Sequence, residues 1–140
     1  MDVDGMVDAL NNALRLQYRS ALAYTLAAGS LVGLRYAPIA STLAEFGHAD
    51  LDDARRIVEK IVTLEGTPVT EVAQVHCHHD GAEALRWLLE IEEEAVEALQ
   101  DCIPYTGQEG RSEAMEHRLE HMIMRKQEQR DTLVRAVREP

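Results

Sequence analysis

The amino-acid sequence predicts an all-α protein that folds as an antiparallel four-helix bundle, and three observations support this fold class. Alanine, leucine, glutamate and arginine, which are good helix formers, dominate the chain. Alternating β-branched residues, which are typical of strands, are scarce. Glycine and proline gather at a few positions, which divide the 140 residues into four long segments. A single domain is expected over residues 1–140, because this length suits one hydrophobic core.

Breaks in the helical pattern locate the first two helices. The first is predicted from about Val3 to Val32, where Gly33 interrupts the pattern. The second begins near Pro38, because proline is favoured in the first turn of a helix. It ends at residues 65–68, Glu-Gly-Thr-Pro, where a glycine followed by proline is typical of a helix C-terminus.

The connection between the second and third helices is the longest one. It covers residues 68–79, after which Asp80 opens the third helix with capping-box spacing. This helix ends near Pro104, and a loop over residues 105–110 leads into a fourth helix at about 112–138. Because the other two connections are short, the topology is a bundle with one long crossover.

Composition and charge exclude several classes of partner. The chain has 14 basic and 25 acidic residues, and its net charge of −11 makes nucleic acid an unexpected partner. No apolar run approaches the ~18 residues of a membrane-spanning helix, and there is no basic amphipathic face for a membrane surface. The N-terminus lacks an apolar signal core, and Cys77 and Cys102 make no disulfide framework. We therefore expect a cytoplasmic protein.

Helical periodicity predicts that three acidic residues face the core. Asp50 falls near the centre of the apolar stripe of the second helix and Asp53 at its edge. Glu92 falls within the stripe of the third helix, whereas the neighbouring glutamates belong to a solvated face. Glu45 and His48 have the spacing of a Glu-x-x-His metal motif, but they point away from the stripe and are rejected as a core site.

The first and fourth helices present other polar groups to the core. Gln17 and Tyr24 lie on the flank of the first apolar stripe. Lys126 falls inside the stripe of the fourth helix, Arg130 flanks it and Arg125 lies further round. The fourth helix therefore directs cations, and not carboxylates, toward the bundle.

Carboxylates on inward faces must pair with a cation, become protonated or bind a metal, because an unpaired buried charge costs several kcal/mol. In one solution the inward oxygen ligands converge on a hard cation such as iron(II) or manganese. These ligands are Asp50, Asp53, Glu92 and Gln17. In the other solution Lys126 or Arg125 supplies the positive charge, and no metal is needed.

Inward carboxylates in a long-crossover bundle are the ferritin-like di-metal arrangement, and the sequence resembles bacterioferritin. Residues 10–24 resemble the first helix of that family. Residues 54–68, from Ala54 through Lys60 to Pro68, resemble the end of its second helix. The resemblance covers nearly the whole chain, and it implies a ferritin-like fold and the binding of iron or manganese.

The same resemblance implies which residues occupy the metal-ligand positions of the family. The ligand glutamates of the first three helices correspond to Gln17, Asp50 and Glu92, and the histidine of the second helix corresponds to Asp53. The implied di-metal centre is incomplete, because a neutral amide replaces one of the family's carboxylates. Weak or absent oxidation of iron(II) is therefore expected.

Two further positions depart from the family pattern. The Glu-x-x-His of the fourth helix corresponds to Met122 and Arg125, which cannot ligate a hard cation in the same way. The methionine that ligates haem in the family corresponds to Leu51, so no haem is expected.

Three functional classes remain open at this point, and whether the protein is an enzyme is not decided by the sequence. The first is a metal-binding protein with the incomplete centre described above. The second is a non-catalytic scaffold or interaction protein whose core carboxylates pair with lysine or arginine. The third is a metal sensor, in which residues 76–79, His-Cys-His-His, bind zinc or copper.

An additional apolar patch on the first helix predicts a homo-oligomer of at least two subunits. It lies off the main apolar stripe, and surplus apolar surface of this kind commonly packs against a partner subunit. Its residues are Leu16, Leu22, Ala23 and Leu26.

Overall fold

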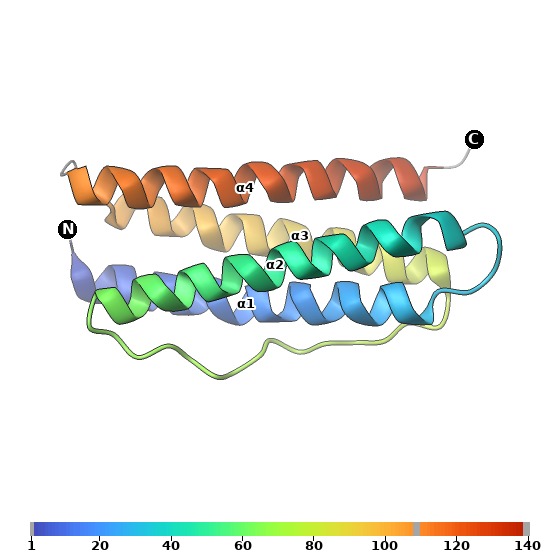
Figure 1. Ribbon diagram of the computed structural model, residues 1–140, viewed down its shortest axis with the longest axis horizontal. Coiled ribbons are helices and arrows are strands. Elements are labelled where there is room, and N and C mark those ends of the chain that lie inside the picture. Colours follow the sequence, from blue (N-terminus) through green and yellow to red (C-terminus); the bar gives the residue numbers. More distant parts are fainter. Residues whose placement is uncertain (1, 108–109, 139–140) are drawn as a thin grey trace.

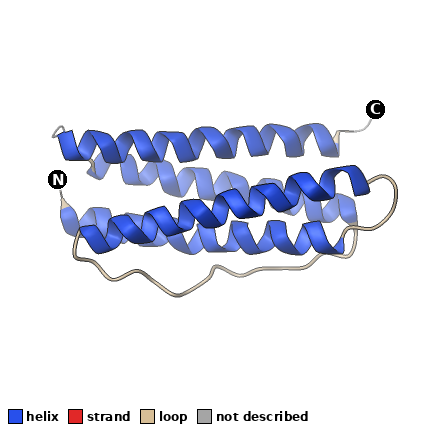
Figure 2. Cartoon of the chain, viewed as in Figure 1, coloured by secondary structure: helices blue, strands red, loops and turns tan. Residues whose placement is uncertain are grey.

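The computed structural model describes residues 2–107 and 110–138, and within these ranges every regular element is a helix. The long helices lie side by side in Figure 1, and Figure 2 shows them joined by loops. The helices are α1 (Val3–Ser30), α2 (Ala37–Thr63), α3 (Gly81–Cys102) and α4 (Gly110–Val137), with one 3-10 turn, η1 (Ile103–Tyr105), after α3. The predicted all-α four-helix bundle is confirmed.

The long crossover makes α2 and α3 run in the same direction, whereas α1 is antiparallel to α2 and α3 to α4 (Figure 1). It passes along the length of the bundle between the end of α2 and the start of α3. Asn11 on α1 binds the first part of the crossover. Its side chain donates to the Thr67 carbonyl at 3.1 Å and accepts from the Val69 amide at 2.9 Å. Tyr18 adds a hydrogen bond to the Val69 carbonyl at 3.3 Å. The crossover is therefore fixed by α1 side chains.

The helix ends differ from the predicted ones by a few residues. α1 ends at Ser30 and not at Val32, because Leu31 takes an extended conformation before the turn at Gly33. α4 begins two residues before the predicted position, at Gly110. The cap of α3 is confirmed, since the Asp80 carboxylate accepts a hydrogen bond from the amide of the third residue that follows it.

The C-terminus of α2 is a Schellman motif, in which the last carbonyls are satisfied by amides beyond the helix. The Gly66 amide donates to the Ile61 carbonyl and the Glu65 amide to the Val62 carbonyl, both at 2.9 Å. Glu65, and not the glycine, takes the left-handed conformation, with φ of 64°. Gly66 is required for another reason, because a Cβ atom there would lie 2.7 Å from Val7 Cγ1 on α1.

Replacing Glu65 by glycine is expected to stabilise the protein by about 0.5–1 kcal/mol. A left-handed residue with a Cβ atom costs about 1–2 kcal/mol, and the greater backbone entropy of glycine in the unfolded chain offsets about half of this gain. Chemical denaturation measures the change. Glu65→Ala keeps a Cβ atom and is the matched control, so an equal gain in that variant would assign the effect to the lost carboxylate.

Two apolar clusters fill the core, and a layer of polar side chains separates them. One cluster includes Leu14, Ile57 and Leu99, and the other includes Leu43, Leu88 and Leu133. The polar layer consists of Gln17, Ser20, Asp50, Asp53, Glu92, Lys126 and Gln129, each of which is at most 1% exposed. The inward orientation predicted for the three acids and for Lys126 is therefore confirmed.

The apolar patch predicted on the first helix is only partly at the surface. Leu16 and Ala23 are buried within the subunit, so their assignment to a partner interface was wrong. Leu22 and Leu26 remain 47% and 41% exposed. The wheel of one helix missed this distinction, because α1 is covered on more than one side by its neighbours. None of the helices in the described part of the chain has the length and apolar character needed to cross a bilayer.

Candidate functional site

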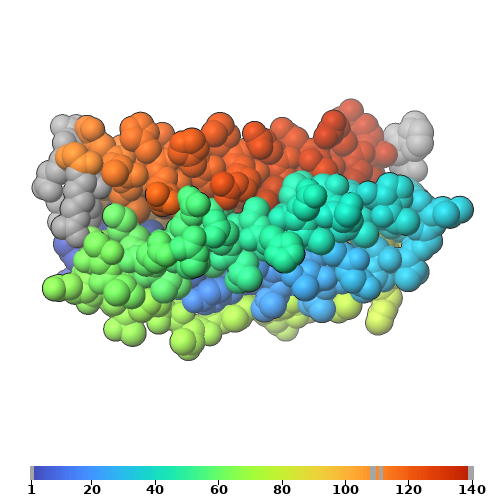
Figure 3. All heavy atoms as spheres, viewed as in Figure 1, coloured from blue at the N-terminus to red at the C-terminus, as the bar shows by residue number. Residues whose placement is uncertain are grey.

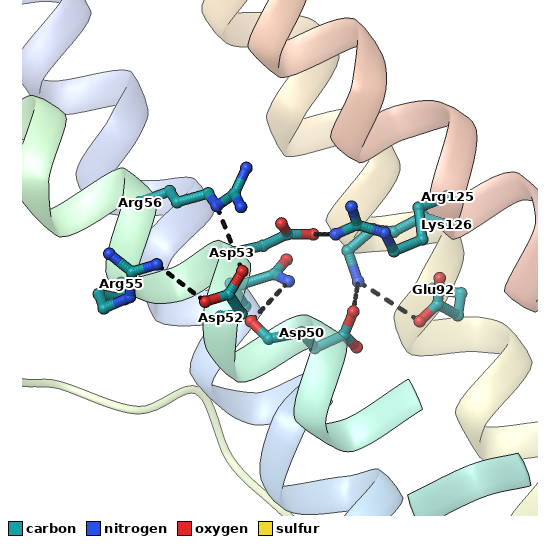
Figure 4. A network of polar contacts seen from close by, with 9 residues as sticks. Asp50, Asp52, Asp53, Arg55, Arg56, Glu92, Arg125 and Lys126 are labelled. Carbon is teal, nitrogen blue, oxygen red and sulfur yellow. Dashed lines mark hydrogen bonds and ion pairs between the residues drawn. The ribbon is translucent and has the colours of Figure 1, made fainter. Parts of the chain in front are cut away.

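The polar layer is centred on Lys126, whose ammonium group lies between two carboxylates from different helices (Figure 4). Lys126 Nζ on α4 is 3.4 Å from Asp50 Oδ1 on α2 and 3.4 Å from Glu92 Oε1 on α3. All three side chains are fully buried. The lysine therefore bridges three helices and compensates charge at the position where the sequence predicted that the acids could share a cation.

Tyr24 extends this network to α1. Its hydroxyl group donates a hydrogen bond of 2.8 Å to Glu92 Oε1, the same oxygen that contacts Lys126. The phenol is fully buried, and burial together with the nearby Glu92 and Asp50 charges holds its pKa well above the usual value. Tyr24 therefore remains a hydrogen-bond donor at neutral pH.

A second ion pair lies at the edge of the polar layer. Arg125 on α4 donates from Nη1 to Asp53 Oδ2 at 2.5 Å. Asp53 is buried, whereas 39% of the Arg125 side chain is exposed. The hydrogen bond to Asp53 raises the pKa of Arg125 above its already high value. The charge of Asp53 is thus compensated within the protein.

Gln17 lies in the polar layer, but its amide group binds the backbone. Gln17 Nε2 donates to the backbone carbonyl of Asp50 at 3.0 Å, which links α1 to α2 at the level of the network. This hydrogen bond gives Gln17 a structural contact. Its role as a metal ligand, which the sequence predicted, stays a prediction.

Burial and the neighbouring opposite charge act in opposite directions on the pKa values of Asp50 and Lys126. Burial raises the pKa of Asp50 to about 7, although Lys126 lowers it and Glu92 raises it further. For Lys126, burial alone would lower the pKa, but Asp50 and Glu92 outweigh that effect and raise it. The ammonium therefore stays protonated, and Asp50 is the group that can exchange a proton near neutral pH.

Several ion pairs outside this layer are exposed and involve no central acid. Asp52 on α2 binds Arg55 at 2.9 Å and Arg56 at 3.2 Å (Figure 4). Arg130, which flanks the apolar stripe of α4, contacts Glu93 at 3.4 Å on the surface of α3. Exposed pairs of this kind contribute little to stability.

Two other groups of potential metal ligands came from the sequence, which are Glu45 with His48 and the crossover residues 76–79. Glu45 and His48 are exposed, as the sequence predicted. His76 and His78 pack against the Trp87 ring, with centroid distances of 5.5 and 5.3 Å, and Cys77 is exposed. Within residues 2–107 and 110–138, no group of three or more His, Cys, Asp or Glu side chains is placed to share a metal.

Two members of the polar layer are not among the site residues predicted from the sequence. Gln129 is 1% exposed and lies one helical turn after Lys126. Ser20 is buried one turn after Gln17. Their spacing from Lys126 and Gln17 is the signal that could have identified them, since residues three or four apart share one helix face.

The fold and the site define an all-α bundle of four long helices with buried carboxylates at its centre. Comparison with known proteins shows the family. A model of the ferritin-like domain matches residues 7–139, so the chain belongs to the ferritin family. A search of curated proteins gave no match.

Solved structures support this assignment at the level of fold. A ferritin-like, diiron-carboxylate protein from Bacillus anthracis aligns with a TM-score of 0.91 and 22% identity, over 99% of both chains. A bacterioferritin-related dodecameric thioferritin from Bacteroides fragilis aligns with a TM-score of 0.87 and 20% identity, over 98% of this chain and 86% of the other. The bacterioferritin of Rhodobacter capsulatus aligns with a TM-score of 0.84 and 20% identity, over 94% of this chain and 82% of the other.

The di-metal site implied by this family does not fit the residues in this arrangement. A cation bridging Asp50 and Glu92 would meet the protonated ammonium of Lys126, which already contacts both carboxylates. Asp53 is bound by Arg125. Like charges at such distances repel strongly in a buried environment, so two metal ions could bind there only if they displaced the lysine.

Proposed function

We propose that this ferritin-like protein does not oxidise iron, and that it works as a non-catalytic subunit of a homo-oligomer. The buried carboxylates that a di-metal centre would use take part in an internal ion-pair network instead. In this proposal the network has a structural role, since it ties α1, α2, α3 and α4 together at the middle of the core.

One observation carries the proposal, which is the contact of Lys126 Nζ with both Asp50 and Glu92 at 3.4 Å in a fully buried layer. Two metals with an open position for dioxygen need several anionic ligands that are free to bind. Here Lys126 contacts both Asp50 and Glu92 and Arg125 binds Asp53, so each of the three inward acids already has a cationic partner. The amide at Gln17 and the side chains at Met122 and Arg125 further reduce the anionic donors available.

An iron-oxidation assay tests the proposal. The purified protein is mixed with iron(II) in air, and formation of iron(III) is followed by absorbance. We expect the rate to equal that of buffer alone, while a ferritin with a working di-iron centre serves as positive control. Rapid oxidation that Glu92→Gln abolishes would contradict the proposal, because it would require a functioning carboxylate centre.

The homo-oligomer is proposed from exposed apolar side chains on α1, α2 and the crossover that follows α2. Leu22, Leu51 and Val72 are 47%, 57% and 38% exposed, and they line one cavity of about 400 Å³. The related thioferritin from Bacteroides fragilis is a dodecamer. A continuous apolar surface of this kind is typical of a subunit interface.

The Leu22→Glu/Leu51→Glu variant is expected to have a smaller assembly mass than the unmodified protein. Two carboxylates in a subunit contact would be buried without partners, which costs several kcal/mol. Sedimentation velocity measures the mass. Val32→Glu/Leu34→Glu alters two exposed apolar residues outside this cavity and is the control. A monomeric unmodified protein would refute the oligomer, whatever the variants do.

A second candidate function is weak binding of one hard cation at the polar layer. Asp50 Oδ2, Asp53 Oδ1 and Glu92 Oε2 are buried and have no hydrogen-bond partner among the described residues. Buried oxygens in this state favour a cation or a donor. Isothermal titration with manganese(II) tests this candidate, which predicts binding that Glu92→Gln weakens.

A further inference from the structure

A cavity of about 340 Å³ lies between α2 and α4, beside the polar layer and open to solvent. The outer surfaces of these two helices meet along the face seen in Figure 3. Three guanidinium groups line the cavity, from Arg56, Arg118 and Arg125. Asp53 is the one acidic residue in its lining.

The charge of this cavity is opposite to that of the chain as a whole. The net charge of the protein is −11, yet three arginines here face a single acid. That acid is already bound to Arg125 at 2.5 Å, and Figure 4 shows the pair with Arg56 nearby on α2. Within the lining, Arg56 and Arg118 therefore have no acidic partner, and Arg56 pairs with Asp52 outside it.

Two of the arginines keep donors for a ligand. Arg118 is exposed and forms no ion pair with another residue in the described part of the chain. Arg56 binds Asp52 through Nε, which leaves its two terminal nitrogens available. Guanidinium groups bind oxyanions through paired N–H donors, so this set suits phosphate better than a lone positive charge would.

The histidines of α4 fit the same assignment. His117 and His121 are spaced four residues apart, which in isolation is a metal-binding pattern, and both line this cavity. Three neighbouring guanidinium groups would repel a metal cation. Imidazole N–H groups can instead donate hydrogen bonds to an anion.

We propose that this cavity binds an inorganic phosphate-type oxyanion, held mainly by Arg118 and Arg56 from opposite helices. The volume accommodates more than one phosphate group, so pyrophosphate is expected to bind more tightly than phosphate. No Trp, Tyr or Phe side chain lines the cavity to stack on a base, so ADP should bind no more tightly than pyrophosphate. This inference does not depend on the proposed function.

Isothermal titration calorimetry of the full chain with pyrophosphate at low ionic strength tests the proposal. Arg118→Gln is expected to weaken binding by at least about tenfold, because it removes charge-assisted hydrogen bonds. Arg56→Gln is expected to weaken it in the same direction. Arg135→Gln makes the same charge change at an exposed position of α4 outside the cavity, and it is expected to alter binding by less than about twofold.

Three results of this titration would overturn the proposal. No binding of pyrophosphate by the unmodified protein would overturn the proposal. Equal weakening in Arg118→Gln and Arg135→Gln would also overturn it, since that result indicates attraction by overall charge. Tighter binding of ADP than of pyrophosphate would refute the inorganic assignment. Circular dichroism checks that each variant is folded. Folding is expected for Arg118→Gln and Arg135→Gln, because both positions are exposed.

Discussion

Replacing Lys126 by methionine is expected to lower the free energy of unfolding by about 3–5 kcal/mol at pH 8, because it leaves buried carboxylates without their cation. The ammonium contacts Asp50 and Glu92 at 3.4 Å each, and all three groups are fully buried. Methionine has a similar length and fills the same space, so the loss reports the charge and not a cavity. Urea denaturation followed by circular dichroism measures it.

Two further variants make this result specific. Arg135→Met removes an exposed cation from the same helix and should change stability by less than about 0.5 kcal/mol. Adding Asp50→Asn and Glu92→Gln to Lys126→Met removes the uncompensated charges and should restore most of the lost stability. A loss below about 1 kcal/mol in Lys126→Met would contradict the inference that the buried lysine stabilises the two acids that it contacts.

The Lys126→Met variant should also gain affinity for divalent cations. The two acids would then be free to bind one, and binding to the folded state alone stabilises it. Manganese(II) should raise the denaturation midpoint of this variant and not that of the unmodified protein. No such difference would indicate that the acids cannot approach one cation even without the lysine.

The difference in the free energy of unfolding between the unmodified protein and Asp50→Asn is expected to depend steeply on pH. Burial raises the pKa of Asp50 to about 7 in the folded protein, from 3.8 as the ordinary value. A group with a raised pKa holds more protons when folded than when unfolded. Its contribution to stability is therefore fully present below about pH 4 and is lost as pH rises toward 7.

The expected size of this effect is about 1.4 kcal/mol per pH unit in the steep part of the range. Other titrating groups change stability too, but they are common to both proteins and cancel in the difference. Urea denaturation at several pH values between 4 and 8 gives this difference directly. A difference that stays constant with pH would show that Asp50 is ionised throughout the range, because Lys126 then dominates over burial.

Local sequence features predicted much of the fold. Pro38 and Asp80 located helix starts correctly, because first-turn proline and a capping carboxylate act on the adjacent backbone. At the end of α2 the position was right, but the left-handed residue is Glu65 and the glycine is required by contact with Val7. A contact with another helix cannot be read from a local turn signal.

The candidate site was likewise predicted only in part from the sequence. Periodicity identified Asp50, Asp53 and Glu92 as inward residues, because a repeat of about 100° per residue fixes the face of a helix without reference to its neighbours. It also placed Lys126 inward. Both possible solutions for the buried acids, a metal or an internal cation, were compatible with that information.

The sequence by itself therefore determined the four long helices, the single long crossover and the inward orientation of Asp50, Asp53, Glu92 and Lys126. Only the tertiary structure decided which cation meets which acid, with Lys126 between Asp50 and Glu92 and Arg125 on Asp53. The physical reason is that the face of a side chain follows from its own helix, whereas its height relative to groups on other helices is set by how the four helices pack together.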